Sequence, residues 1–356
     1  MNNFISMKEF EKEQIIEILN YASILKEKKD NTNICDKKII ASLFFEPSTR
    51  TRLSFTSAAF RVGAKVLGFD SPDATSIQKG ETLRDTLKVI NGYSDLIIMR
   101  HPRDGAAKLA TDIVDIPVIN AGDGSNEHPS QTMLDLFTIK EEFSTLENLK
   151  VAFLGDLKYG RTVHSLTEAL SLFKTEFYFV ANEILQIPKY ILEDLDKKNI
   201  KYHILDKYDE ILSEIDVLYV TRVQKERLPS LELYEKIKDD FIVNKESILN
   251  CKESMIILHP LPRINEINID VDSTKHAKYF TQAKNGLIMR QAMIAIALRD
   301  KEIKKNQREK KIIIKKSEKI VCENPNCITH VENTENKVIE EKNKNFCYYC
   351  SREITL

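Results

Sequence analysis

The sequence predicts an α/β protein with two doubly wound parallel-sheet domains and a small C-terminal β-rich module that resembles a zinc ribbon. Two observations predict the domains: short apolar runs of strand length recur along the chain, and stretches with helical apolar spacing separate them. Strands that are joined through helices pair in parallel and form α/β sheets. The third observation predicts the module: four of the six cysteines lie in two close pairs near the C-terminus.

Length and composition restrict the class of protein. The chain has 356 residues, of which 42% are hydrophobic and 30% are charged, and its formal net charge is −1. This length suits two or three folding units, and the balanced charge gives no overall attraction to nucleic acid. No apolar run reaches the roughly eighteen residues of a membrane span, and the first residues lack the features of a secretory signal. We therefore expect a cytoplasmic protein without a membrane partner.

The first half of the chain alternates strand and helix candidates after an N-terminal helix. The strand candidates are KKIIASLFF, AKVLGF, DLIIM and IPVIN. Helical spacing appears in TRLSFTSAAFRVGA, which Gly63 closes, in GETLRDTLKVINGY and in SQTMLDLFTIKEEF. We expect residues 1–140 to form the first domain.

The second half repeats the pattern. Its strand candidates are LKVAFLG, EFYFVA, KYHIL, VLYVT and MIILH, and GRTVHSLTEALSLF has helical spacing. We expect residues 141–285 to form the second domain and residues 286–300 to return to the first domain as a helix. The lysine-rich segment 301–320 is predicted to be a linker, or to contain the first strand of the module at 321–356.

Polar residues follow five of the predicted strands. In open parallel sheets, ligands bind beyond the carboxyl ends of the strands. Any one of these polar segments has an ordinary explanation as solvated surface, but five of them together predict a ligand-binding cleft. The segments are EPSTRTR, RH, AGDGSNEHPSQ, RVQKER and HPLPR.

The segment EPSTRT predicts a phosphate site. Ser48, Thr49, Arg50 and Thr51 open a helix directly after a strand. A helix start offers unpaired N–H groups and a positive dipole end, to which this segment adds hydroxyls and a guanidinium. Helix capping by Ser48 or Thr49 is the alternative, but it leaves Arg50 unexplained.

Further donors come from other strand ends. Arg100, His128 and Gln131 follow neighbouring strands and can stabilise an oxyanion. No Walker A or GxGxxG segment is present, so the phosphate is expected to belong to a small substrate.

The second domain supplies cationic side chains of its own. Arg161, and Arg222 with Gln224, come from separate strand ends. Two arginines can grip two carboxylates, which makes a small dicarboxylate a plausible second substrate.

These motifs resemble those of the aspartate carbamoyltransferase family, whose members join carbamoyl phosphate to L-aspartate in pyrimidine (UMP) synthesis. The matching segments include FFEPSTRTRLSF, TSIQKGET, IIMRHP, AGDGSNEHPSQTMLDLFTI, GDLKYGRTVHSL, TRVQKERL and HPLPR. The resemblance implies that carbamoyl phosphate is bound by Ser48, Thr49, Arg50, Thr51, Arg100, His128 and Gln131, with Ser76 and Lys79. It implies that aspartate is bound by Lys79, Arg161, Arg222 and Gln224, with backbone contacts from Pro260 and Leu261.

The resemblance also implies roles and an assembly. It gives the catalytic roles to Arg50, Thr51, Arg100 and His128, without a metal or organic cofactor in the reaction, and it implies a cis bond between Leu261 and Pro262. Ser76 and Lys79 would reach the site of a neighbouring subunit, which implies a homotrimer; a higher assembly through the C-terminal module stays open. The alternatives are an ornithine carbamoyltransferase, which shares the phosphate half, or another carbamoyltransferase, and a non-catalytic binding or regulatory protein on the same fold.

The C-terminal cysteines predict a metal site. Cys322, Cys327, Cys347 and Cys350 form a C-x4-C and a C-x2-C pair that nineteen residues separate. In a reducing compartment, four thiolates at this spacing suit a closed structural Zn²⁺ site, and metal binding would supply folding free energy. A redox dithiol is the alternative, and His330 is a substitute ligand that four cysteines make unnecessary.

The module also resembles the zinc domain of the regulatory chain of the same family. This resemblance implies a fusion of catalytic and regulatory parts without the nucleotide-binding domain that precedes the zinc domain in the family. Acidic residues interleave with the lysines around the cysteines, so we expect no nucleic-acid partner.

Overall fold

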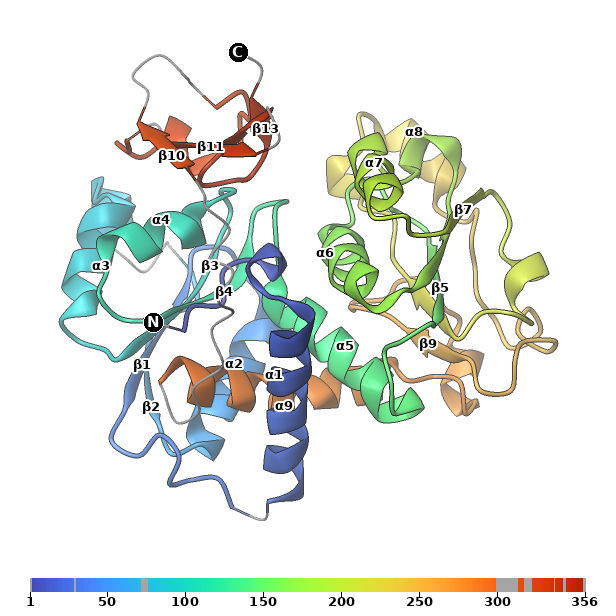
Figure 1. Cartoon of the computed structure of the whole chain (residues 1–356), viewed down its shortest axis with the longest axis horizontal. Coiled ribbons are helices and arrows are strands. Elements are labelled where there is room, and N and C mark those ends of the chain that lie inside the picture. The colour runs from blue at the N-terminus through green and yellow to red at the C-terminus, as the bar shows by residue number, and fades with distance from the viewer. Residues whose placement is uncertain are drawn as a thin grey trace. The chain divides into compact units, whose positions relative to one another are not determined.

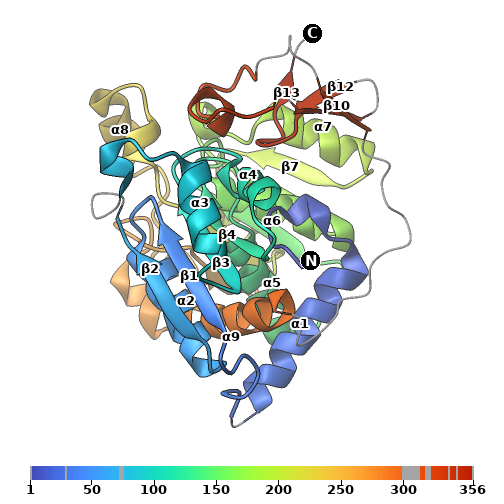
Figure 2. The ribbon, with the colours of Figure 1, turned by 90° about the vertical axis from the view of Figure 1, so that its left-hand side faces the viewer.

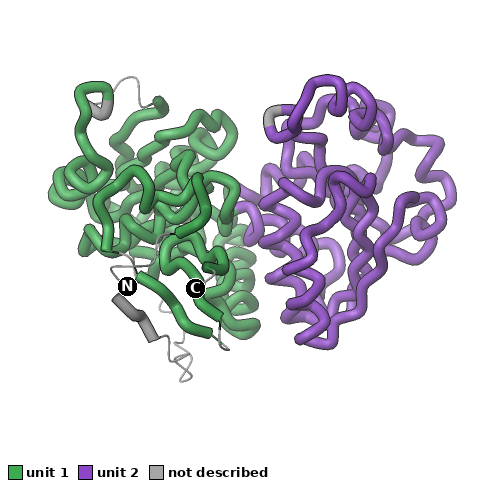
Figure 3. Tube along the Cα trace, turned by 90° about the horizontal axis from the view of Figure 1, so that it is seen from above, with its two compact units in different colours: residues 1–130, 287–356 green, residues 131–286 purple. Residues whose placement is uncertain are grey.

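The structure is a computed structural model (Figure 1), and it describes residues 2–28, 30–71, 76–298, 313–316, 322–335, 337–341 and 344–354. The chain forms two compact units (Figure 3), one of residues 1–130 with 287–356 and one of residues 131–286. Among the described residues, no helix is long and apolar enough to cross a membrane.

The first unit is built on a four-stranded parallel sheet in the order β2-β1-β3-β4. Its strands are β1 (Ile39–Phe44), β2 (Lys65–Phe69), β3 (Leu96–His101) and β4 (Val118–Asp123). Its helices are α1 (Lys12–Glu27), α2 (Thr49–Arg61), α3 (Leu83–Asn91), α4 (Ala106–Ile113) and the second half of α9 (Tyr279–Ala297).

Helices cover both faces of this sheet. The chain moves from β1 outward to β2 through α2, and then moves in the opposite direction to β3 and β4 through α3 and α4. Because such crossovers are right-handed, the two directions put their helices on opposite faces. Figure 2 shows α3 and α4 away from α2 and α9. The central strand β1 is therefore buried along nearly its whole length.

The second unit is built on a five-stranded parallel sheet in the order β7-β6-β5-β8-β9. Its strands are β5 (Lys150–Leu154), β6 (Glu176–Val180), β7 (Tyr202–Leu205), β8 (Val217–Val220) and β9 (Ile256–Leu258). Its helices are most of α5 (Pro129–Phe143), α6 (Arg161–Leu170), α7 (Lys189–Lys197), α8 (Leu231–Ile237) and the first half of α9. Phe153 lies at the centre of one face, where it stacks on Phe177 and Phe179.

The C-terminal module is an antiparallel sheet in the order β10-β11-β12-β13. Its strands are β10 (Ile313–Lys316), β11 (Lys337–Glu341), β12 (Lys344–Cys347) and β13 (Glu353–Ile354). The strand β10 falls in the segment 301–320, most of which lies outside the described residues. The module belongs to the first compact unit.

Short 3₁₀ helices lie in several of the connections. They are η1 (Met7–Glu9), η3 (Ser76–Lys79), η4 (Ser171–Phe173), η5 (Glu183–Leu185), η6 (Asp209–Ile211), η7 (Lys225–Arg227), η8 (Ile269–Ser273) and η9 (Ile328–His330).

The predicted fold class is confirmed: there are two parallel α/β sheets and a C-terminal antiparallel sheet. Every strand predicted for the two domains is present. The return helix begins at Tyr279, seven residues before the predicted start at 286, and the ring of Tyr279 is fully buried. Apolar spacing does not single out the short helix α4, because eight residues contain little more than two turns.

Candidate active site and metal centre

Two groups of predicted site residues lie where a parallel sheet reverses its winding direction: Ser48 to Thr51 with Arg100, and Arg161 with Arg222 and Gln224. The reversal falls between β1 and β3 in the first unit and between β5 and β8 in the second. Helices leave the two sides of such a point toward opposite faces, so the carboxyl ends of the strands border a crevice.

The first half-site contains the start of α2. Ser48 is the N-cap residue, yet its side chain makes no capping hydrogen bond, and no acidic residue lies in the first turn. The hydroxyl is therefore not committed to capping, which was the alternative to an anion site. Thr49, Arg50 and Thr51 form the first turn, and the side chain of Thr51 is buried.

Arg100 ties this helix start to the neighbouring strands. It pairs with Phe44 across β1 and β3, its Nη2 lies 2.9 Å from Oε2 of Glu46, and its Nη1 donates to the carbonyl of Ala121 at 3.2 Å. The buried Nε–H has no acceptor among the described residues. An unsatisfied buried donor costs about 1–3 kcal/mol, which an anionic ligand oxygen would offset.

His128 precedes α5 and is 5% exposed. Its Nδ1 lies 3.2 Å from the hydroxyl of Ser130. Gln131 occupies the first turn of the same helix, where its Nε2 donates to Oδ1 of Asp135 at 2.8 Å. The end of β4 and the start of α5 thus present an imidazole and an amide with defined neighbours.

Two buried carboxylates hold the loop that leads to His128. Asp123 accepts hydrogen bonds from the backbone N–H of Gly105 at 2.7 Å and of Glu127 at 3.1 Å. Glu127 accepts from the hydroxyl of Ser6 at 2.6 Å and from the backbone N–H of Met7 at 3.0 Å. Burial raises the pKa of Asp123 to about 6 and that of Glu127 to about 7, although the hydrogen bonds oppose the shift.

The second half-site contains the cationic residues of the second unit. Arg161 begins α6 after β5, and Arg222 and Gln224 follow β8, the next strand of the sheet. The fully buried Asp156 joins the two loops, because its carboxylate accepts from the backbone N–H of Tyr159 at 3.0 Å and of Gln224 at 3.2 Å. The loops that carry Arg161 and Arg222 therefore share one anchor.

Pro260 and Leu261 follow β9, beside β8. The bond from Leu261 to Pro262 is cis, as the resemblance implied, and Leu261 has φ +55°. This left-handed conformation costs a leucine on the order of 1 kcal/mol. The backbone N–H of Leu261 donates to Nδ1 of His259 at 2.7 Å, which helps to hold the conformation.

Ser76 and Lys79 are the two ends of η3 in the first unit. The side chain of Lys79 is exposed. The assignment of both residues to a neighbouring subunit stays a prediction.

The four C-terminal cysteines form a compact, buried cluster. All four Sγ atoms lie within 4.8 Å of one another, with 3.6 Å between Cys322 and Cys350 and 3.8 Å between Cys327 and Cys347. Ideal tetrahedral coordination with metal–sulfur bonds of about 2.3 Å separates the sulfurs by about 3.8 Å. The cluster therefore fits a metal ion with four thiolate ligands. The Nε2 atom of His330 lies 2.7 Å from the backbone carbonyl of Cys322, so its ring is engaged beside the cluster.

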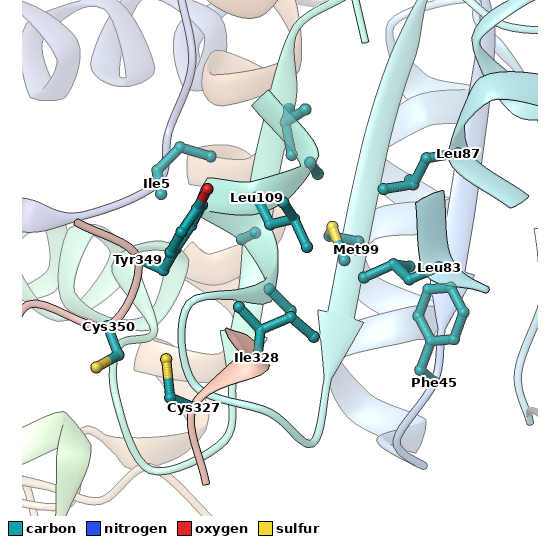
Figure 4. Close-up of a cluster of buried hydrophobic side chains, with 14 of the residues drawn as sticks. Ile5, Phe45, Leu83, Leu87, Met99, Leu109, Cys327, Ile328, Tyr349 and Cys350 are labelled. Atoms are coloured by element: carbon teal, nitrogen blue, oxygen red, sulfur yellow. The ribbon is translucent and has the colours of Figure 1, made fainter. Parts of the chain in front are cut away.

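The module packs on helices α3 and α4 and on the N-terminal segment of the first unit. Ile328 and Tyr349 of the module belong to one buried cluster with Ile5, Leu83 and Leu109 (Figure 4). Two backbone hydrogen bonds join the cysteine loop to the start of α4: Asp104 N–H donates to Asn326 at 3.0 Å, and Ile328 N–H donates to Asp104 at 2.9 Å. The approach is close because Gly105 has no side chain.

Asp104 is fully buried at this contact and accepts hydrogen bonds from the module and from the loop before His128. Its carboxylate accepts from the side-chain amides of Asn324 and Asn326, each at 2.9 Å. It also accepts from the backbone N–H of Ser125 at 2.8 Å, in the loop that leads to His128. One carboxylate thus links the cysteine module to that loop.

Patterns in the sequence do not identify the buried acids that organise these loops. They are Asp104, Asp123, Glu127, Asp135, Asp156 and Glu266. A weak signal is present for two of them, because an acid follows a glycine near the end of β4 and of β5 in the segments AGDG and LGDL. Such a segment predicts a turn as readily as a site.

Comparisons with known proteins agree with this geometry. The model of the aspartate/ornithine carbamoyltransferase carbamoyl-P binding domain matches residues 2–141, and that of the Asp/Orn binding domain matches residues 147–297. The aspartate carbamoyltransferase catalytic subunit of Brachyspira hyodysenteriae is 54% identical over 99% of both chains. This chain belongs to the aspartate carbamoyltransferase family of transferase enzymes. The Brachyspira member of the family aligns through the cysteine module as well.

Other members of the family match the two α/β units. The catalytic subunit of Thermococcus onnurineus is 50% identical over 83% of this chain and 96% of its own. Among solved structures, the catalytic subunit of M. jannaschii aspartate transcarbamoylase has a TM-score of 0.80 and 48% identity, covering 84% of this chain and 99% of its own. The Trypanosoma cruzi enzyme in complex with carbamoyl phosphate and aspartate has a TM-score of 0.78 and 37% identity, covering 83% and 96%.

The raised pKa of Glu127 predicts a pH-dependent stability. Between its ordinary value of 4.5 and about 7, the folded chain binds a proton that the unfolded chain has released. The free energy of unfolding therefore falls as the pH rises through this window. Glu127→Gln removes this contribution, which amounts to about 3 kcal/mol at most. Urea unfolding at a series of pH values should give a flatter profile for the variant.

Glu193→Gln, which changes an exposed carboxylate on α7, is the matched control and should keep the wild-type profile. An unchanged slope in Glu127→Gln would show that the carboxylate is already ionised throughout this range.

The contact at Gly105 predicts how the module can be displaced. A Cβ atom at Gly105, which has φ +83°, would lie 2.6 Å from the backbone of Tyr349, whereas one at Gly80, which has φ +89°, would meet nothing within 4 Å. Both alanine variants bear the cost of a left-handed backbone, but only Gly105→Ala should lift the module. Hydrogen exchange should accelerate at residues 324–331 in Gly105→Ala and stay slow in Gly80→Ala. Equal protection in both variants would contradict the described docking.

Proposed function

We propose that the protein is an aspartate carbamoyltransferase, which converts carbamoyl phosphate and L-aspartate into N-carbamoyl-L-aspartate and phosphate in pyrimidine (UMP) synthesis. The observation that carries the proposal is Arg100 at the carboxyl end of β3, whose side chain is 11% exposed and whose buried Nε–H has no acceptor among the described residues. A doubly charged acyl phosphate supplies phosphate and carbonyl oxygens as acceptors of the required kind.

The first half-site would bind carbamoyl phosphate. The start of α2 and the side chains of Ser48, Thr49 and Arg50 would hold the phosphate. Thr51, Arg100 and His128 would donate to the carbonyl oxygen, and Gln131 would orient the carbamoyl amide. Donors that are fixed before the reaction stabilise the charge that develops on this oxygen.

The reaction then needs little further chemistry from side chains. The free amine of aspartate attacks the carbamoyl carbon, a C–N bond forms, and the carbonyl oxygen becomes negative. The bond from this carbon to the bridging oxygen breaks, and the departing phosphate takes up the proton of the amine. Holding both reactants in line supplies much of the rate enhancement.

The second half-site would bind aspartate and exclude ornithine. Arg161 and Arg222 match the two carboxylates, Gln224 adds an amide donor, and the backbone of Pro260 and Leu261 borders the amine. The side chain of ornithine carries an ammonium group, which the two guanidinium groups would repel.

The active assembly would be a homotrimer. Ser76 and Lys79 would enter the site of a neighbouring subunit, where the ammonium group of Lys79 would contact both substrates. Exposure of the Lys79 side chain supports this role.

The C-terminal module would hold one structural Zn²⁺ through Cys322, Cys327, Cys347 and Cys350. It would serve as a brace for the first unit and as the contact for any higher assembly. The proposed origin of the module is the zinc domain of a regulatory chain, joined here to a catalytic chain. The close clustering of the four buried sulfurs supports the metal, and the hydrogen bonds of Asp104 support the brace.

Substrate assays test the catalytic proposal. We expect turnover of carbamoyl phosphate with L-aspartate and none with L-ornithine. His128→Asn should lower kcat by about 10²–10³, as expected for the loss of one oxyanion donor. Arg222→Met should raise the KM for aspartate at least about tenfold, because it removes a charge-assisted hydrogen bond worth about 1.5–3 kcal/mol.

Arg61→Met removes an exposed arginine at the end of α2 and should leave both constants unchanged. Turnover of ornithine would overturn the assignment of the second substrate. Absence of any carbamoyl transfer would favour the non-catalytic alternative.

Metal analysis tests the module. We expect one zinc per chain, and its removal by a chelator with a thiol reagent should unfold the module before the parallel sheets, because a unit this small depends on its metal. Circular dichroism and hydrogen exchange would follow the two steps. A chain cut after Leu298 should keep its parallel sheets but be less stable, since Leu83 and Leu109 lose their apolar cover. A cut chain with unchanged stability would contradict the bracing role.

A further inference from the structure

A chain of buried polar side chains in the second unit runs from Gln131 to Leu261. Its centre is the fully buried Asp135 on α5. One carboxylate oxygen, Oδ1, accepts from Nε2 of Gln131 at 2.8 Å and from Nε2 of Gln282 at 2.6 Å. The other, Oδ2, accepts from the hydroxyl of the fully buried Tyr219 at 2.9 Å. Asp135 therefore fixes the orientation of two amide groups.

Gln282 connects α9 to the loop after β9 by a hydrogen bond. Its side chain is 1% exposed, and its Oε1 accepts the backbone N–H of His259 at 2.9 Å. Because Nε2 donates to Asp135 and Oε1 accepts from His259, the amide has one allowed orientation. A rotation of this amide would break both bonds.

His259 and Glu266 complete the chain. Nδ1 of His259 accepts the backbone N–H of Leu261 at 2.7 Å, so the ring proton is on Nε2, which donates to Glu266 at 2.7 Å. Burial raises the pKa of Glu266, but the hydrogen bonds from His259 and from backbone N–H groups lower it by more, so the net shift is downward. Glu266 also accepts the backbone N–H of Ile264 at 3.0 Å. The loop around Leu261 is thus held from both sides.

Stability alone is a poor explanation for this chain. Buried carboxylates are costly, and apolar side chains of similar volume often stabilise a core as well or better. Both ends of the chain are residues to which substrate contacts are assigned under the proposed function. A neighbouring buried hydrogen bond, from Asn285 to Thr138 at 3.2 Å, also joins α9 to α5. It contacts neither Gln131 nor Leu261.

We propose that Asp135, Gln282 and His259 are positioning residues that couple the carbamoyl group at Gln131 to the aspartate-binding backbone at Leu261. This inference rests on the proposed function and deepens it. When carbamoyl phosphate fixes the amide of Gln131, Asp135 and Gln282 become more rigid, and His259 then holds Leu261 in its left-handed conformation. The ordering cost at the aspartate loop is met before aspartate binds. Coupling of this kind is reciprocal, so aspartate increases the affinity for carbamoyl phosphate by the same factor.

Binding of two unreactive analogues tests the inference in the full-length protein. Phosphonoacetamide has a methylene group in place of the bridging oxygen and cannot transfer its carbamoyl group, and succinate lacks the attacking amine. Calorimetry gives the Kd of phosphonoacetamide with and without saturating succinate, and the ratio is the coupling factor. For the wild type we expect a factor of about five or more.

Two matched variants distinguish the effect of this hydrogen-bond chain from a general effect on packing. Gln282→Met keeps the side-chain length but removes both hydrogen bonds, so the factor should fall to within about twofold of unity. The KM for aspartate should rise, while kcat at saturating aspartate stays near the wild-type value. Asn285→Leu removes the neighbouring bond between the same helices and should keep the wild-type factor.

The outcomes are distinct. A wild-type factor in Gln282→Met, or equal losses in both variants, would overturn the coupling while the proposed function stands. A wild type that does not turn over aspartate would overturn both. If Gln282→Met does not fold, Glu266→Gln, which loosens His259 from the opposite side, carries the same expectation and the same criterion.

Discussion

The single reversal of winding in each parallel sheet is the constraint on which both half-sites depend. Right-handed crossovers cover opposite faces on the two sides of the reversal, so the strand ends there are not roofed by a helix. The chain uses this opening twice. In the first unit it lies between the start of α2 and the end of β3, and in the second it lies between the loops after β5 and β8; the start of α5 and the loop after β9 come from the next strand of each sheet. The sheets supply rigid positions, and the loops supply the chemistry.

Buried carboxylates give these loops their fixed shapes. A carboxylate has about four acceptor positions, so one acid can hold several N–H groups from separate segments. Asp104 holds the cysteine module and the loop before His128, Asp156 holds the loops of Arg161 and Arg222, and Asp135 holds two helices. The desolvation of these acids is costly, and in return the substrate-binding groups need little ordering when ligands arrive.

Local patterns in the sequence were sufficient for the strands, the fold class and the candidate residues at the strand ends. Short apolar runs and the polar segments after them are properties of neighbouring residues, and a sheet brings such ends together. The partners of the buried acids could not be predicted in this way. Asp135 and Gln282 are 147 positions apart, and Asp104 and Asn324 are 220 apart, so no local period connects them. The left-handed Leu261 is equally hidden, because sequence alone would favour glycine at such a position.

Because the cysteine module docks on α4 of its own chain, it competes with any separate chain for that face. A tethered module meets its face at an effective concentration on the order of millimolar. A separate chain with a similar cysteine loop, present at micromolar concentration, would have to bind this face far more tightly than the tethered module does. The loop from Asn324 to Ile328 therefore opposes replacement of the tethered module by a separate chain. Whatever larger assembly the protein forms must use surfaces that this loop leaves uncovered, including the outer face of the module itself.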